Sequence, residues 1–264
     1  MARLFMVPYL RVAVCSLAGA YLLLALYGCS VSDSLIFLPP AATYHLGPDI
    51  LEIPAPDGVT LAARYLFCPA SRYTLIYFHG NAEDLGGVEP RLRLLRDRLH
   101  VSVLGWDYPG YGRSGGLVGE RATLRDAHAV LAYVTGPLGV QAERVVLFGR
   151  SLGGGPAVEL ASSGRCGGLI LESTFTSAFR VMTGVRLLPF DKFANLEKMP
   201  RVKCPVLVIH GTADQTIPFS HGQKLFAAAP EPKYRLWVEG AGHNDLVETA
   251  GEAYWQALER FLAR

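Results

Sequence analysis

The sequence predicts a mixed α/β fold in which helices cover both faces of a mostly parallel sheet. From residue 75 onward, short runs rich in β-branched and aromatic residues alternate with segments of helical spacing. Such near-continuous apolar strands are typical of a sheet buried on both faces, because every crossover between parallel strands lays a helix over the sheet. An earlier segment, 49–67, instead alternates apolar and polar residues around Asp57-Gly58, which predicts an antiparallel N-terminal hairpin.

After the hairpin, the expected strands and helices follow one another along the chain. The strands are expected at 75–78, 101–106, 145–148, 169–171, 206–209 and 235–238. The helices are expected at 88–99, 123–134, 156–162, 221–229 and 246–262. Together with the hairpin, they predict one domain over residues 49–264.

The segment 174–203 interrupts this alternation. It lies between two predicted strands and contains several large apolar residues, namely Phe175, Phe179, Met182, Val185, Leu187, Leu188 and Phe190. An apolar insert of this length over the carboxyl edge of a sheet favours a small lid or an acyl-binding wall. The alternative is a crossover segment that packs into the core.

Composition limits the kinds of partner that we expect. The chain has 264 residues, half of them hydrophobic, which is enough to bury one large core. The formal net charge is +2, and the only charged residues before Cys29 are Arg3 and Arg11, so the rest of the chain is neutral. A neutral domain has no electrostatic footprint for nucleic acid, and we expect no nucleic-acid partner.

The N-terminus has the pattern of an export signal. A short segment with two arginines precedes 17 uncharged, largely apolar residues, 12–28. The run ends in Leu26-Tyr27-Gly28-Cys29, which resembles the bacterial lipobox, in which the cysteine is acylated and becomes the new N-terminus. We therefore expect a signal peptide over 1–28, lipid attachment at Cys29, a membrane-proximal linker over 29–48 and a location in a bacterial envelope.

Two alternatives to cleavage remain for this segment. A run of 17 residues is at the lower limit of the roughly 17–25 that span a bilayer, so it can also be a retained signal anchor. The other alternative is a first helix buried in the domain. The three later cysteines, Cys68, Cys166 and Cys204, are isolated in the sequence, which argues against a disulfide framework and favours small buried thiols.

The segment Gly149-Arg150-Ser151-Leu152-Gly153 matches G-x-S-x-G, the nucleophile elbow. It follows a predicted strand and precedes a predicted helix, which is the context that the motif requires. The serine of an elbow lies on a sharp, strained turn, and Gly149 and Gly153 leave room where a Cβ would clash. The alternative is an ordinary glycine-rich turn between a strand and a helix.

A serine hydroxyl becomes a nucleophile only when a base and an orienting carboxylate accompany it. Asp214 follows the predicted strand 206–209, and His243 follows the last predicted strand. The chain order Ser, Asp, His is the one found in α/β-hydrolases, and loops after parallel strands emerge at one edge of the sheet. We therefore expect Ser151 as nucleophile, His243 as base and Asp214 as orienting acid, with Glu172 as the rival acid.

An acyl-transfer site also needs donors for the oxyanion. The first is expected from the N–H of Leu152, directly after the nucleophile, and the second from Asn81, in the loop that follows strand 75–78.

Other kinds of site are not favoured. The histidines show no H-x-x-x-H or H-x-x-E-H spacing, so we expect no metal and no cofactor. The segment 110–115 matches G-x-G-x-x-G, but no acidic residue occurs in 127–142 and no helix follows at once, which argues against a nucleotide site. Asp107 is expected to cap the turn at Pro109-Gly110.

Several of these motifs resemble one family when they are taken together. They are His79-Gly80-Asn81-Ala82-Glu83-Asp84-Leu85, Asp107-Tyr108-Pro109-Gly110-Tyr111-Gly112, the elbow, and the segments 190–195, 209–214 and 237–245. This set is similar to the α/β-hydrolase branch that includes the eukaryotic membrane-associated protein depalmitoylases, and the likeness covers 35–262. It implies the α/β-hydrolase fold and a serine hydrolase that cleaves acyl esters or thioesters at a membrane, with Ser151, Asp214 and His243 as its triad.

The chain departs from that branch at its N-terminus. Those depalmitoylases are tethered by a cluster of palmitoylated cysteines, whereas this chain has a leader and the single Cys29, which favours lipid or small ester substrates over acylated proteins. The alternatives are a serine peptidase or amidase of the same fold, and a non-catalytic lipoprotein that serves as a binding module.

Overall fold

The computed structural model describes residues 2–183 and 190–264, and omits the side chains of residues 2–10, 29, 30, 182 and 183. Its centre is an eight-stranded sheet with the order β1-β2-β4-β3-β5-β6-β7-β8. The strands are β1 (Leu51–Pro54), β2 (Thr60–Leu66), β3 (Thr74–Phe78), β4 (Ser102–Trp106), β5 (Val145–Arg150), β6 (Gly168–Glu172), β7 (Val206–Gly211) and β8 (Lys233–Val238). β2 runs antiparallel to β1 and β4, and all other pairs are parallel, so the predicted mixed sheet with an antiparallel N-terminal hairpin is confirmed.

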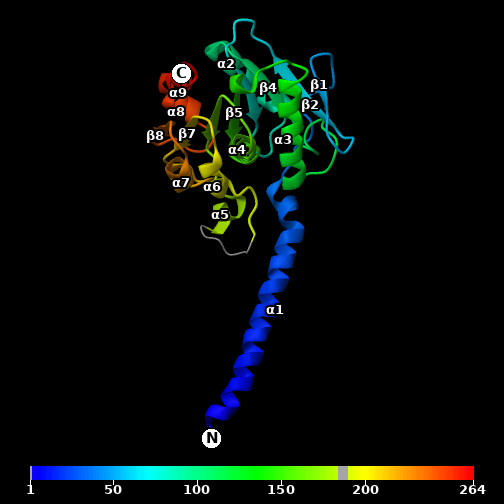
Figure 1. The fold of residues 1–264 in the computed structure, drawn as a ribbon, viewed down its shortest axis with the longest axis vertical. Helices are drawn as coiled ribbons and strands as arrows, with labels where there is room; N and C mark the ends of the chain where they lie inside the picture. The colour runs from blue at the N-terminus through cyan, green and yellow to red at the C-terminus, as the bar shows by residue number, and fades with distance from the viewer. Residues whose placement is uncertain (1, 184–189) are drawn as a thin grey trace.

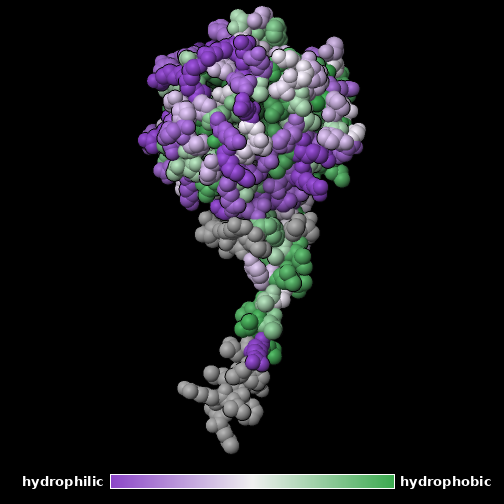
Figure 2. Space-filling model, in the orientation of Figure 1, coloured by the Kyte–Doolittle hydropathy of each residue, from purple (hydrophilic) through white to green (hydrophobic). Residues whose placement is uncertain are grey.

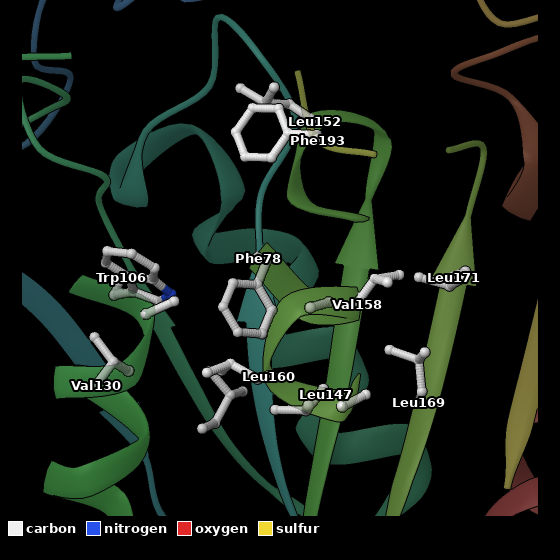
Figure 3. Packing of buried hydrophobic residues seen from close by; sticks show 14 of the residues in the cluster. Phe78, Trp106, Val130, Leu147, Leu152, Val158, Leu160, Leu169, Leu171 and Phe193 are labelled. Atoms are coloured by element: carbon white, nitrogen blue, oxygen red, sulfur yellow. The ribbon is translucent and has the colours of Figure 1, made fainter. Parts of the chain in front are cut away.

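Helices cover both faces of the sheet (Figure 1). Side chains that alternate along one strand point to opposite faces, so Ile76 and Phe78 of β3 belong to one core cluster while Leu75 and Tyr77 belong to the other. The first cluster contains residues of α3 (Glu120–Thr135), α4 (Gly154–Ser163) and α7 (Ser220–Ala228). The second contains residues of α2 (Leu85–Leu99), α8 (Leu246–Ala250) and α9 (Glu252–Leu262). Figure 3 shows part of the first cluster, in which Phe78 lies between Trp106 and Val158.

The predicted helix over 246–262 is wrong in one respect, because the structure has two helices there. α8 ends at Ala250 and α9 begins at Glu252. Between them, Gly251 has φ +53°, in the left-handed region that ends a helix and that glycine enters without steric cost. The two helices still cover the same face of the sheet.

The first helix, α1 (Ala2–Ile36), extends away from the domain (Figure 1). Its segment Arg11–Gly28 has a mean hydropathy of 1.6 and only 6% of it is buried, so by length and composition it is able to cross a membrane. Figure 2 shows hydrophobic residues along this helix, whereas the visible face of the domain is mostly hydrophilic. Burial against the domain, the third alternative from the sequence, does not occur for this segment.

The C-terminal end of α1 is attached to the domain. The carboxylate of Asp33 accepts a hydrogen bond from the N–H of Glu120 (3.3 Å) and lies 3.1 Å from the Lys192 ammonium. The ring of Phe37 is buried and packs against Tyr111 and Phe193 at centroid distances of 6.4 and 5.9 Å. The segment expected as a linker, 29–48, therefore begins as helix and continues as a strap that packs on the domain.

The insert 174–203 contains α5 (Ala178–Thr183), α6 (Asn195–Lys198) and the short 3₁₀ helix η3 (Met199–Arg201). Phe175, Phe193 and Met199 are buried in the first core cluster, as the core-packing alternative predicts. Val185, Leu187 and Leu188, which carried part of the lid prediction, lie outside the described residues, as does the side chain of Met182.

Candidate active site

The sequence G-x-S-x-G forms a tight turn at the end of β5. Ser151 has φ +50°, a left-handed conformation that is strained for a residue with a side chain. A Cβ on Gly149 would lie 2.6 Å from the carbonyl oxygen of Gly153, so this position accepts only glycine. The Thr174 hydroxyl, at the start of the insert, donates a hydrogen bond of 2.7 Å to the Ser151 carbonyl and supports the turn. The serine therefore lies at the carboxyl edge of the sheet, between β5 and α4.

The structure brings Ser151, His243 and Asp214 together. The Ser151 Oγ lies 3.0 Å from the Nε2 of His243, and the Nδ1 of His243 lies 2.8 Å from the Oδ2 of Asp214. The three residues follow β5, β8 and β7, whose carboxyl ends share one edge of the sheet. The arrangement forms one continuous hydrogen-bond chain from a carboxylate through an imidazole to a hydroxyl.

Asp214 is held as a carboxylate. Its side chain is fully buried, and its Oδ1 accepts hydrogen bonds from the N–H groups of Thr216 (2.9 Å) and Ile217 (2.8 Å). Burial alone would raise the pKa of Asp214, but the hydrogen bonds of His210, His243 and the Ile217 N–H outweigh it and lower the pKa below its ordinary value. An ionised Asp214 accepts a hydrogen bond from the N–H at Nδ1 of His243, which leaves the unprotonated Nε2 able to take the proton of Ser151.

Asn81 lies beside Ser151 in a cavity of about 610 Å³, but its side chain is engaged elsewhere. The amide oxygen of Asn81 accepts hydrogen bonds from the N–H of Leu38 (2.9 Å) and the hydroxyl of Tyr111 (2.6 Å). The amide nitrogen donates to the Ile36 carbonyl at 2.5 Å. A donor to an oxyanion from this position must therefore be the backbone N–H, and the side chain instead holds the end of α1 against the loop. Leu152, whose N–H is the other expected donor, is buried directly after the nucleophile.

Arg150 is a residue of this site that the sequence interpretation did not assign. Its guanidinium donates to the Glu83 carboxylate at 2.8 Å and to the Asn244 side-chain oxygen at 2.6 Å. Glu83 also accepts the N–H of Gly80 at 2.6 Å, in the loop of Asn81, while Asn244 is next to His243. Arg150 thus connects the loop after β3 to the histidine loop. An arginine beside the nucleophile was visible in the sequence, but its partners are distant along the chain and no local pattern pairs them.

Glu172, the rival acid, forms hydrogen bonds with Arg91 and Tyr254 and not with His243 in the described structure. It is 1% exposed, and its carboxylate accepts hydrogen bonds from Arg91 (2.7 Å) and from the Tyr254 hydroxyl (2.6 Å). The Nε of Arg150 lies 3.4 Å from it. Among the described residues these are its partners, and the acid that contacts His243 is Asp214.

The prediction for Asp107 is wrong about what it caps. Its Oδ1 accepts the N–H of Leu85 (2.8 Å), the first residue of α2, and its Oδ2 accepts the hydroxyl of Tyr44 (2.5 Å). Asp107 therefore holds the start of a helix and the strap after α1, rather than the turn at Pro109-Gly110. Sequence proximity favoured the turn, whereas the sheet places the end of β4 next to α2.

Both polar and apolar residues line the cavity beside Ser151. Its lining consists of Leu38, Gly80, Asn81, Ala82, Glu83, Arg91, Arg150, Ser151, Thr216, His243 and Asn244. Among the described residues, none from the insert belongs to this lining, and no group of three or more His, Cys, Asp or Glu is placed to hold a metal ion.

Known proteins resemble the chain in sequence. No protein-family model matches it. The α/β hydrolase domain-containing protein 17B of Xenopus laevis is 40% identical over 199 residues, which cover 75% of this chain and 68% of that protein. The human protein of the same name is 39% identical over 206 residues, covering 77% and 70%. The chain belongs to the α/β-hydrolase domain-containing protein 17 family.

Solved structures share the fold of this chain. The Pyrococcus furiosus esterase Pf2001 superposes with a TM-score of 0.71 at 21% identity, covering 86% of this chain and 98% of that one. A hydrolase from Pseudomonas aeruginosa PA01 gives 0.65 at 20% identity, covering 83% and 100%. The predicted fold and the resemblance to the α/β-hydrolase superfamily are confirmed. The two sequence relatives, from Xenopus laevis and human, are vertebrate proteins and do not support the expected bacterial envelope lipoprotein.

Proposed function

We propose that this α/β hydrolase is a membrane-anchored serine hydrolase that cleaves acyl esters or acyl thioesters through an acyl-enzyme. The observation that carries the proposal is the hydrogen-bond chain from Asp214 through His243 to Ser151, with distances of 2.8 and 3.0 Å. Together with a strained serine at the tip of an elbow, it has the geometry of a base-activated nucleophile.

Each residue then has a defined step. His243 Nε2 takes the proton of Ser151 as Oγ attacks the acyl carbon, and the imidazolium returns that proton to the leaving alcohol or thiol. Water, deprotonated by the same nitrogen, then attacks the acyl-enzyme and releases the acid. Asp214 holds His243 in the required tautomer, and the backbone N–H groups of Asn81 and Leu152 stabilise the oxyanion in both halves of the reaction.

The N-terminal helix favours the interpretation that the substrate lies at a membrane. Arg11–Gly28 of α1 has the length and hydropathy of a membrane span, and Leu38, two residues beyond the end of α1, lines the cavity that holds Ser151. We propose that α1 is retained as an anchor. Arg3 precedes the span and Arg11 is its first residue, whereas residues 29–48 contain no Lys or Arg, so the positive-inside rule directs the domain to the non-cytosolic side.

The activated serine can be tested on the full-length protein in detergent micelles with a fluorophosphonate probe. We expect the wild type to be labelled, Ser151→Ala to be unlabelled and His243→Ala to be labelled far more slowly. Ser162→Ala, on α4, is the matched control because the bond that its hydroxyl makes within the described part of the chain is to the nearby Glu159 carbonyl. A folded wild type without labelling would contradict the proposal and favour a non-catalytic binding module.

The leaving group can be tested with substrates of one acyl chain length. We expect p-nitrophenyl esters and acyl thioesters to be hydrolysed, and the matching p-nitroanilide to react far more slowly. Faster turnover of the anilide than of the ester would instead favour the peptidase or amidase alternative.

The anchor has its own test. Membranes from cells that express the full-length chain should retain the protein after extraction with alkaline carbonate. Its release as an intact chain would contradict a retained span. A mature protein that begins at an acylated Cys29, identified by mass spectrometry, would replace the retained anchor by lipid attachment at that residue.

A further inference from the structure

Two cysteines meet at the edge of the sheet opposite the candidate active site. Cys166 precedes β6 and Cys204 precedes β7, and the two strands are parallel neighbours with Leu169 opposite Val206. Their Sγ atoms lie 3.1 Å apart. Cys204 is buried and Cys166 is half-buried. The sequence interpretation had treated both as isolated thiols.

The position of the two sulfurs favours a covalent bond between them. The N–H of Leu169 donates to the Pro205 carbonyl at 2.9 Å, which keeps the two segments that enter β6 and β7 side by side. Closing the gap between the sulfurs from 3.1 Å to a bond of about 2.05 Å requires only a small movement of two side chains.

The two thiols also differ in reactivity. Their mutual hydrogen bond lowers the pKa of Cys166 below its ordinary value and, with burial, raises that of Cys204. Cys166 is thus the thiol that ionises first, and it is also the less buried residue of the pair. This is the arrangement of an attacking thiolate next to a resolving thiol.

We propose that Cys166 and Cys204 form an intramolecular disulfide by exchange with a low-molecular-weight disulfide or a thiol–disulfide oxidoreductase. The Cys166 thiolate attacks one sulfur of that oxidant, which breaks its S–S bond and releases one thiol. Cys204 then loses its proton and attacks the sulfur of Cys166 in the mixed disulfide, releasing the second thiol. Two cysteine thiols are oxidised and one external disulfide is reduced to two thiols.

The bond would close a long loop. The segment between the two cysteines contains β6 and the whole insert, and tying its ends together reduces the freedom of the unfolded chain. The pair lies at the amino edge of the sheet and Ser151 lies at the carboxyl edge, so stability should change while the catalytic geometry does not. The proposed export of the domain would place the pair in an oxidising compartment, where disulfides persist.

Peptide mapping tests the bond directly. The full-length protein in detergent micelles is incubated with oxidised glutathione or with dithiothreitol, its free thiols are alkylated during denaturation, and it is digested with trypsin. After oxidised glutathione we expect peptides 166–180 and 204–224 to be joined and two hydrogen atoms lighter than their sum. Alkylation of both cysteines, or glutathione that remains on Cys166, would overturn the proposal.

Thermal unfolding provides the second measurement. The oxidised wild type should have a Tm roughly 5–10 °C above that of the reduced form, given the length of the closed loop. Cys68→Ser is the matched control and should keep this difference, whereas Cys204→Ser should abolish it even if its own Tm is lower. An equal Tm for both forms of the wild type would overturn the stabilising role. Fluorophosphonate labelling does not enter either measurement, so failure of the disulfide and failure of the proposed hydrolase are distinguishable.

Discussion

Two of the histidine–aspartate pairs at the carboxyl edge of the sheet have opposite surroundings. In the first, the Nδ1 of His243 lies 2.8 Å from Asp214, and its Nε2 faces a serine. In the second, the Nε2 of His79 lies 3.5 Å from Asp107, while its Nδ1 contacts the Gly80 carbonyl at 2.7 Å. His79 is also stacked on Tyr108 at 4.1 Å and is almost fully buried.

The two aspartates respond to burial in different ways. Burial raises the pKa of Asp107, and the nearby His79 together with the hydrogen bonds from Tyr44 and Leu85 only partly offsets it. The pKa of Asp214 is lowered, because its hydrogen bonds outweigh burial. The same two residue types thus form a structural contact in one place and the geometry of a base in the other. The difference depends on the ring nitrogen that does not contact the aspartate. In His243 this nitrogen faces the Ser151 hydroxyl, and in His79 it faces the Gly80 carbonyl.

The largest expected contrast is between the two histidines. His243→Ala should lower kcat for an ester by about 10⁶-fold, because Ser151 loses its base. His79→Ala should lower kcat by about tenfold or less but should lower the Tm, because a buried ring is removed from the core. The measurement is steady-state hydrolysis of a p-nitrophenyl ester with a thermal melt of each variant. A greater loss of kcat in the His79 variant would reverse the assignment.

Asp214 and Asp107 should show the same contrast in kcat, with a smaller difference between the two variants. Asp214→Asn should lower kcat by about 10⁴-fold, since the amide no longer holds His243 in the right tautomer. Asp107→Asn should leave kcat within tenfold and reduce the free energy of unfolding by about 1–3 kcal/mol, since it disturbs buried hydrogen bonds to Tyr44 and Leu85. Kinetics and urea unfolding of both variants test this. Equal losses of kcat would show that the two pairs do not differ in role.

The pH dependence of stability should differ in sign between the same two aspartates. The pKa of Asp214 is lower in the folded protein, so its ionised form contributes stability above the ordinary carboxyl pKa of about 4, and this contribution is lost only as the pH falls below that value. The pKa of Asp107 is higher in the folded protein, so its ionisation costs stability. That cost disappears as the pH falls through the raised pKa toward the ordinary value.

Urea unfolding between pH 7 and pH 4 measures the difference. The stability lost through Asp107→Asn, relative to the wild type, should grow as the pH falls over this range, because the wild type gains stability there. The loss through Asp214→Asn should stay constant over the same range. Parallel trends in the two variants would contradict the opposite pKa directions.

The smallest expected effect concerns Asn81. Asn81→Ala keeps the backbone N–H and removes the hydrogen bonds to Ile36 and Leu38, so kcat should fall by about tenfold or less. A side-chain donor to the oxyanion would instead cost about 10²–10³-fold. Tyr111→Phe, which removes one hydrogen bond to the same amide, is the matched control and should have a smaller effect. A loss above 10²-fold in the alanine variant alone would assign the side chain to the oxyanion site.

Much of the fold could be predicted from the sequence because its signals are local. The buried strands are runs of apolar residues, the helices have helical spacing, and the turn at Asp57-Gly58 has its own residue preference. The elbow was visible for the same reason, since its five residues are consecutive and a Cβ on Gly149 would meet the Gly153 carbonyl, two residues after Ser151. The contact that requires glycine at position 153 is not local, because a Cβ there would meet the carbonyl of Phe78, on β3. The chain order of Ser151, Asp214 and His243, with one residue after each of three strands, was enough to predict that they meet.

Only the tertiary structure decided which side chains that are distant in the sequence contact one another. The sequence marks Asn81 and Arg150 as neighbours of the site, but not that one holds the end of α1 and the other joins Glu83 to Asn244. It shows Cys166 and Cys204 as isolated, and only the pairing of β6 with β7 brings them together. The physical reason is that local patterns determine elements and their order, whereas contacts between loops depend on strand register and on which face each side chain meets.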